Sequence, residues 1–142
     1  MVLRGWVKVD SRFIELFHTT FVSGGRQLKT GVDCQGIFLA TMKLYGHDVK
    51  DTDTAVYATE VVSGLIDEAA KSNKWEKIES PEEGCAVVIA LDPMHPDLVQ
   101  HLGVYTGEGK FIHILEKRGV CLTRIDDRFF SQKIRGYYRW KG

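Results

Sequence analysis

The chain has 142 residues, a length that suits one domain with a single buried core. Its 19 basic residues balance its 19 acidic ones, so it lacks the excess of positive charge expected of a protein that binds nucleic acid. No run approaches the roughly 18 apolar residues of a membrane span, and the first residues lack the apolar core of a signal peptide, so we expect neither a membrane span nor a cleaved export signal.

The N-terminal half is expected to be helical. A short helix should run over residues 10–17, with Asp10 or Ser11 as its cap. A glycine-containing loop over 23–31 follows. Apolar residues at helical spacing then predict a helix over 34–45, which Gly46 ends. A further helix is expected from residue 53 or 54 to about residue 71.

The C-terminal half is expected to form an antiparallel sheet. The apolar run 85–91 fits a central strand, and 100–105 and 110–115 fit two strands joined by a glycine-containing turn at 107–109. A last strand over 135–140 would close the sheet. Helices followed by a sheet predict an α+β domain, with the helices packed on the antiparallel sheet.

Cys34 is the candidate nucleophile. It occupies the first turn of the predicted helix, where unpaired backbone N–H groups and the helix dipole favour a thiolate, the form that attacks a carbonyl. A cysteine on the apolar side of a helix can instead be an ordinary core residue.

Cys85 and Cys121 lie in apolar, strand-like runs and are expected to be core residues. Three widely spaced cysteines with no C-x-x-C pair argue against a disulfide framework or a zinc site.

Two histidines are the candidate partners of this thiol. If the hairpin is symmetric, Tyr105 lies opposite Phe111. Gly103 then lies opposite His113, and His101 lies opposite Leu115. Because side chains alternate along a strand, His101 and His113 then share one face as diagonal neighbours, and Gly103 has no side chain to separate them. His101 would act as the base and later as the acid, and His113 would orient the His101 ring, although His113 could simply fill space in the sheet.

The motifs, in this order along the chain, resemble those of the NlpC-type peptidases of the papain-like superfamily. They are Gly24-Gly25, Gly31-Val32-Asp33-Cys34-Gln35-Gly36, His101-Leu102-Gly103-Val104-Tyr105, Gly109-Lys110-Phe111-Ile112-His113 and Gly136-Tyr137-Tyr138-Arg139. The resemblance covers residues 10–140 and implies a papain-like α+β fold in which Cys34, His101 and His113 form the catalytic triad. It also implies contacts with substrate at Asp33, Gly103 and Ser23. Asp33 is more simply a helix cap.

Two positions depart from this family. Phe21 stands where the family usually has a tyrosine whose hydroxyl helps to bind substrate or the oxyanion, so oxyanion stabilisation falls to the Cys34 N–H and to Ser23 or another backbone N–H. Cys85 stands where an aspartate is usual.

The resemblance implies hydrolysis of a peptidoglycan stem peptide through a thioester, without a metal or an organic cofactor. The expected bond joins D-glutamate to the diamino acid. We expect one catalytic domain over 1–142, acting at the bacterial cell wall after synthesis in the cytoplasm, with a phage tail and its proteins as the favoured setting. The alternatives are an inactive structural or peptide-binding module of a phage tail, and a thiol acyltransferase or amidase that acts on small or lipid amides.

Overall fold

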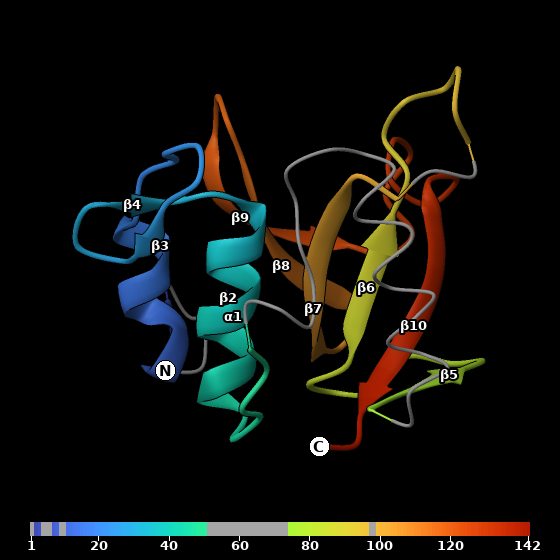
Figure 1. Ribbon diagram of the computed structural model, residues 1–142, viewed down its shortest axis with the longest axis horizontal. Coiled ribbons are helices and arrows are strands. Elements are labelled where there is room, and N and C mark those ends of the chain that lie inside the picture. The colour runs from blue at the N-terminus through green and yellow to red at the C-terminus, as the bar shows by residue number, and fades with distance from the viewer. Residues whose placement is uncertain (1, 4–6, 9–10, 51–73, 97–98) are drawn as a thin grey trace.

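The computed structural model describes residues 2–3, 7–8, 11–50, 74–96 and 99–142, and the helix expected from residue 53 or 54 to 71 lies outside them. Within the described part, a helix stands against one face of a large antiparallel sheet, which confirms the predicted α+β class (Figure 1).

The sheet has six strands in the order β5-β10-β6-β7-β8-β9, all antiparallel to their neighbours. The strands are β5 (Trp75–Ile78), β6 (Ala86–Ile89), β7 (His101–Gly107), β8 (Lys110–Leu115), β9 (Gly119–Arg124) and β10 (Ile134–Trp140). Four of them were expected from the sequence. The last strand does not close the sheet, because β10 lies between β5 and β6, and β5 forms that edge.

Strands β5 and β9 were missed by the sequence analysis. β5 has only four residues, of which two are exposed, so it carries little apolar pattern. β9 is half-buried along most of its length, and it is recognised only by its pairing with β8, from Lys110↔Arg124 to Leu115↔Gly119.

Several short elements precede the helix in the chain. η1 (Ser11–His18) is a 3-10 helix where an ordinary short helix was expected. The short strands β3 (Arg26–Gln27) and β4 (Gly31–Val32) form a hairpin, and β1 (Val2–Leu3) pairs with β2 (Val7–Lys8). Helix α1 (Cys34–Leu44) agrees with the expected bounds, and it is followed by Gly46 in the left-handed region at φ +79°.

The two faces of the sheet carry separate apolar clusters. One lies under α1 and η1 and joins their side chains to Leu102, Val104, Ile112 and Ile114. The other contains Phe111 and Phe130 and lies on the opposite face, because side chains alternate along β7 and β8. Along β7 and β8, every second side chain therefore packs under the helix, and the side chains between them pack on the opposite face.

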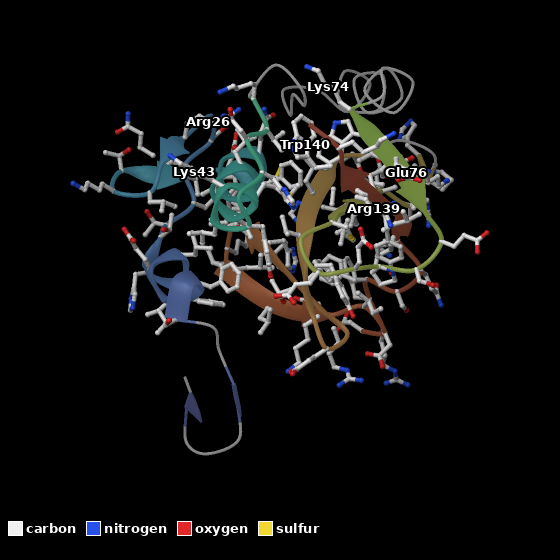
Figure 2. All side chains as sticks on the ribbon, turned by 90° about the horizontal axis from the view of Figure 1, so that it is seen from below. Arg26, Lys43, Lys74, Glu76, Arg139 and Trp140 are labelled. Carbon is white, nitrogen blue, oxygen red and sulfur yellow. The ribbon has the colours of Figure 1, made fainter. Side chains whose placement is uncertain are left out.

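The exposed edge of the sheet away from α1 carries an ionic cluster. Arg139 on β10 lies 2.5 Å from Glu76 on β5 and also binds Glu82 (Figure 2). These groups are largely exposed, so they add little to stability.

Candidate active site

The start of α1 is held by the side chain of Asp33. Its Oδ1 accepts a hydrogen bond from the Gly36 N–H (2.9 Å), which caps the helix as expected. Its Oδ2 accepts from the Gly24 N–H (3.1 Å), and the Arg26 guanidinium lies 2.7 Å from Oδ1. Both carboxylate oxygens are thus engaged, and they tie the loop and the β3–β4 hairpin to the first turn of the helix.

Gly36 allows this loop to lie directly on the helix. A Cβ at Gly36 would lie 2.5 Å from the Gly25 carbonyl oxygen and 2.7 Å from the Val32 Cβ. These contacts are closer than a side chain permits, and one of them is to backbone, which cannot move out of the way. The glycines of the motif therefore serve the close packing that positions residue 34.

Cys34 lies at the edge of β7. Its side chain is buried, with 7% of the residue exposed, and a backbone hydrogen bond from Leu102 reaches its sulfur. Leu102 is the neighbour of His101 in the chain. The start of α1 therefore lies beside the strand that carries the predicted base.

The predicted histidines are hydrogen-bonded to each other. His101 Nε2 lies 2.8 Å from His113 Nδ1, and His113 Nε2 lies 2.8 Å from Thr123 Oγ1 on β9. The His113 ring packs against Phe111 and Phe130, with centroids 4.6 and 4.9 Å away. Both histidines are buried, so their orientation is determined by these contacts.

The predicted register of the hairpin is confirmed where β7 and β8 are paired. Tyr105 is paired with Phe111 as expected, and the next pair, Val104↔Ile112, continues the same register. The ladder ends there, so the expected places of His101 and His113 opposite Leu115 and Gly103 stay predictions. Their side chains still share the face that carries Phe111, which is the face turned away from α1. Cys34 is instead part of the cluster under α1.

The expected thiolate is not the favoured resting form. Burial, together with the negative charge of Asp33, raises the pKa of the Cys34 thiol to about 11, against smaller opposing effects of the Leu102 and Cys34 N–H groups and Arg26. Burial also lowers the pKa of His101 to about 4 and that of His113 to about 3. At neutral pH the site therefore holds a thiol and two neutral imidazoles, because burial raises the pKa of the thiol by more than the Cys34 N–H at the helix start lowers it.

The predicted substrate contacts have different surroundings. Asp33 is occupied by the cap, the loop and Arg26. Ser23 lies exposed in the turn closed by the Gly25 N–H and the Val22 carbonyl. Gly103 is buried, and a Cβ there would lie 2.7 Å from the Phe111 ring, so its lack of a side chain serves packing in the first place.

Phe21 lies beside the start of the helix. It forms a bridge with Val32, two residues before Cys34, and its half-buried ring packs against the cluster under α1. The ring offers no donor to an oxyanion, in agreement with the reasoning from its residue type.

Three participants were missed by the sequence analysis: Arg26, the backbone of Leu102 and Thr123. No pattern in the sequence pairs Arg26 with Asp33, seven residues away. Thr123 could have been found only by recognising strand β9 and its register with β8. In that register Cys121 is opposite His113, and Thr123 lies two residues further along β9.

The other cysteines lie outside this site and are free. Cys85 is 1% exposed, as expected of a core residue. Cys121 is only partly buried, and its thiol is 3.5 Å from the Gly119 carbonyl oxygen.

Over the described ranges, no three histidine, cysteine or acidic residues are grouped so that they could hold a metal ion. None of the helices described is long and apolar enough to cross a membrane.

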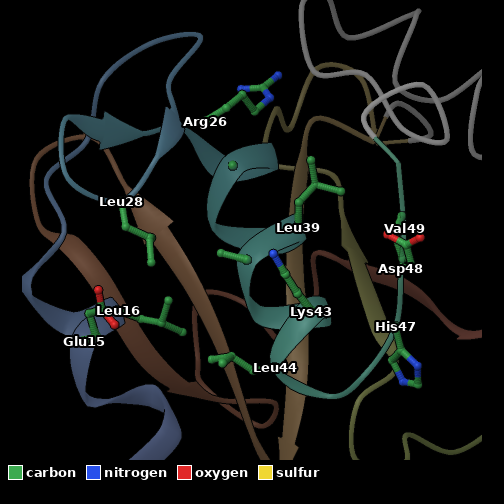
Figure 3. Close-up of a pocket in the computed structure, with 12 residues that line it drawn as sticks. Glu15, Leu16, Arg26, Leu28, Leu39, Lys43, Leu44, His47, Asp48 and Val49 are labelled. Atoms are coloured by element: carbon green, nitrogen blue, oxygen red, sulfur yellow. The ribbon is translucent and has the colours of Figure 1, made fainter.

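A pocket of about 570 Å³ lies along α1, next to this site but separate from it (Figure 3). Its lining includes Leu16, Leu28, Leu39 and Leu44, with the charged groups of Arg26 and Lys43. Cys34, His101 and His113 do not line it.

Comparisons with known proteins show the family and the fold. A model of the NlpC/P60 family matches residues 18–139. An NlpC/P60 family protein from Bacillus cereus ATCC 10987 is similar in structure, with a TM-score of 0.61 and 18% identity over 85% of this chain and 35% of that one. NlpC2 from Trichomonas vaginalis gives a TM-score of 0.62 and 18% identity over 85% and 41%.

A third similar structure is the NlpC/p60 domain of the peptidoglycan hydrolase SagA, with a TM-score of 0.56 and 14% identity over 90% of this chain and 92% of that one. This chain thus spans less than half of the length of the first two proteins and most of the SagA domain. No match was found among curated protein sequences. At these identities the structures establish the fold, and the predicted NlpC-type, papain-like architecture is confirmed.

Proposed function

The chain belongs to the NlpC/P60 family, and we propose that it is a cysteine hydrolase that cuts an amide bond in the stem peptides of bacterial peptidoglycan. The single observation that carries this proposal is the His101–His113 hydrogen bond of 2.8 Å, next to the point where Leu102 binds the Cys34 sulfur. A buried imidazole pair and a thiol at a helix start are the groups needed for nucleophilic attack assisted by a base, which supports the proposal.

In the proposed reaction the proton moves as the sulfur attacks. Because His101 Nε2 is bonded to His113, its Nδ1 is the nitrogen that takes the Cys34 proton. The Cys34 N–H stabilises the oxyanion, with Ser23 or another N–H as the second donor. His101 then gives its proton to the departing amine, leaving a thioester. A water molecule, deprotonated by His101, releases the acyl group and restores the thiol.

General base assistance fits the resting site better than a preformed ion pair. The raised pKa of Cys34 and the lowered pKa of His101 both favour the neutral partners. Transfer of the proton during attack avoids a buried thiolate and imidazolium in the free enzyme.

The family supports the proposed substrate. The SagA domain belongs to a protein named as a peptidoglycan hydrolase, and we propose the same polymer here, with the bond between D-glutamate and the diamino acid as the site of cleavage. The substrate contacts are assigned to Asp33, Ser23 and Gly103, and residues 1–142 to one catalytic domain. We propose that the protein acts at the cell wall, as part of a phage tail.

Mass spectrometry of muropeptides incubated with the protein tests the proposal. The wild type should release fragments with new amine termini, and Cys34→Ala and His101→Asn should release none. His95→Asn changes an exposed histidine in another loop and should retain wild-type turnover. Products from all four proteins alike, or from none, would contradict the proposal.

Two observations favour a second candidate, an inactive structural or peptide-binding module of a phage tail. Phe21 has no hydroxyl to donate, and the thiol is buried and protonated. Binding of stem peptides without any turnover by the wild type would support this candidate.

A further inference from the structure

The side chains of His101, His113 and Thr123 form a continuous hydrogen-bonded chain. His101 Nε2 meets His113 Nδ1 at 2.8 Å, and His113 Nε2 meets Thr123 Oγ1 at 2.8 Å. A neutral imidazole has one N–H and one acceptor nitrogen, so a ring that donates one of its two hydrogen bonds must accept the other. The direction of the hydrogen bond at Thr123 therefore determines the direction of the one between the two histidines. Thr123 lies at the far end, on β9, and no reacting atom touches it.

The chain can be ordered in only two ways while both imidazoles are neutral. If Thr123 accepts, His113 carries its proton on Nε2 and accepts at Nδ1 from His101 Nε2–H. His101 Nδ1 is then unprotonated and can take a proton. If Thr123 donates to His113 Nε2, both histidines carry the proton on Nδ1, and His101 has no basic nitrogen left for Cys34.

We propose that Thr123 is a positioning residue that selects the reactive tautomer of His101 by accepting a hydrogen bond from His113. The inference rests on the proposed role of His101 as the base, and it extends the His101–His113 pair to a residue outside the triad. The hydroxyl acts only through the two rings, and its effect is on which nitrogen holds the proton.

The position of Thr123 supports this role. Its register is determined by the β8–β9 pairing, in which Thr123 is opposite Phe111 and Cys121 is opposite His113. The side chain is half-buried and lines a pocket of about 680 Å³, where water can accept a hydrogen bond from the hydroxyl. A hydroxyl that donates its hydrogen bond to this water can at the same time accept one from His113 Nε2–H.

The other neighbours of the His113 ring are aromatic, which removes competing partners. The rings of Phe111 and Phe130 lie 4.6 and 4.9 Å from it between centroids, and they cannot accept the proton of His113 as a nitrogen or oxygen would. Within the described residues, the polar groups bonded to the His113 ring are therefore His101 and Thr123.

The test compares Thr123→Val, which keeps the shape and removes the hydroxyl, with Thr123→Ser, which keeps the hydroxyl. Nitrogen-15 NMR of the histidine rings reports which nitrogen holds each proton, and it needs no turnover. The wild type and Thr123→Ser should both show protonated Nε2 and unprotonated Nδ1 on His101 and His113. Thr123→Val should show a mixture of the two tautomers.

Kinetics on a stem peptide give the second readout. Thr123→Val should lower kcat by roughly tenfold with KM unchanged, because loss of the correct tautomer removes the base and not the binding site. Thr123→Ser should remain near the wild type. Thermal melting of each variant establishes that it is folded.

The outcomes separate this inference from the proposed function. Protonated Nδ1 on both histidines in the wild type, or unchanged tautomers in a folded Thr123→Val protein, would overturn the inference. The expected tautomers in a wild type that cleaves no peptide would overturn the proposed function and leave the role of Thr123 supported.

Discussion

His101 Nε2 lies 2.8 Å from His113 Nδ1, although neither residue is among those paired between β7 and β8, whose ladder ends at Val104↔Ile112. The side chains of the two histidines therefore meet beyond the last assigned pair of the ladder. The backbone of Leu102, the next residue after His101, acts on the Cys34 sulfur at the start of α1. The strand that carries His101 thus lies beside the start of the helix.

The first prediction concerns the reactivity of Cys34. Because burial raises its pKa to about 11, the thiolate fraction at pH 7 is small and increases with pH. We expect alkylation of Cys34 by iodoacetamide, followed by peptide mass spectrometry, to have a midpoint well above the value of about 8.5 for a free thiol.

His101→Asn should leave this midpoint nearly unchanged, because the neutral ring of His101 adds no charge beside the sulfur at these pH values. A midpoint below that of a free thiol that moves upward in His101→Asn would instead establish a thiolate–imidazolium pair and contradict the neutral resting site.

The second prediction concerns the charges next to the thiol. Asp33 raises the pKa of Cys34 and Arg26 lowers it. Asp33→Asn keeps an oxygen that can accept from the Gly36 N–H and removes the charge, so the alkylation midpoint should fall. Arg26→Gln should move it upward.

Burial is the largest cause of the raised pKa, so both shifts should be smaller than the displacement from a free thiol. Lys43→Gln changes an exposed cation farther along the same helix and serves as the matched control. Shifts of the same sign in Asp33→Asn and Arg26→Gln would show that these charges do not act as described.

The third prediction concerns stability in acid. The pKa of His101 falls from 6.5 in the unfolded chain to about 4 in the folded one. Between these values the unfolded chain binds the extra proton, so stability is complete above pH 6.5 and is lost progressively toward pH 4. This histidine alone should contribute roughly 3 kcal/mol to that loss.

Urea unfolding at a series of pH values checks this prediction. The free energy of unfolding of His101→Asn should depend less steeply on pH between 6.5 and 4 than that of the wild type. His95→Asn, at an exposed position, should keep the wild-type slope. Parallel curves for His101→Asn and the wild type would contradict a buried neutral His101.

The fourth prediction concerns the missing hydroxyl at Phe21. Its bridge to Val32 holds the ring two residues from the Cys34 position. If the oxyanion lacks a donor there, Phe21→Tyr should raise kcat by roughly tenfold or more, since a single donor is worth about 10² to 10³ in rate. Phe21→Leu should give no increase.

Both variants are measured on the same stem peptide as the wild type, with melting temperatures as a check of folding. Unchanged kcat in a folded Phe21→Tyr protein would mean that the backbone donors suffice without this hydroxyl.

Local patterns determined much of the fold from the sequence. Helical spacing and the glycine that follows gave α1 to within a residue, and alternation gave β7 and β8 with the correct pair Tyr105↔Phe111. These features depend on neighbours along the chain, so composition and spacing suffice to predict them. The short strand β5 and the half-buried β9 carry too little apolar pattern to be found in this way.

The sequence by itself determined which residues could do chemistry: a cysteine at a helix start and two histidines on one face of a hairpin. Only the tertiary structure decided their state and their partners. Burial depends on everything packed around a group, and it makes the thiol and the imidazoles neutral against the local preference of the helix end. The contacts of Arg26 and Thr123 likewise join segments whose closeness no local spacing encodes.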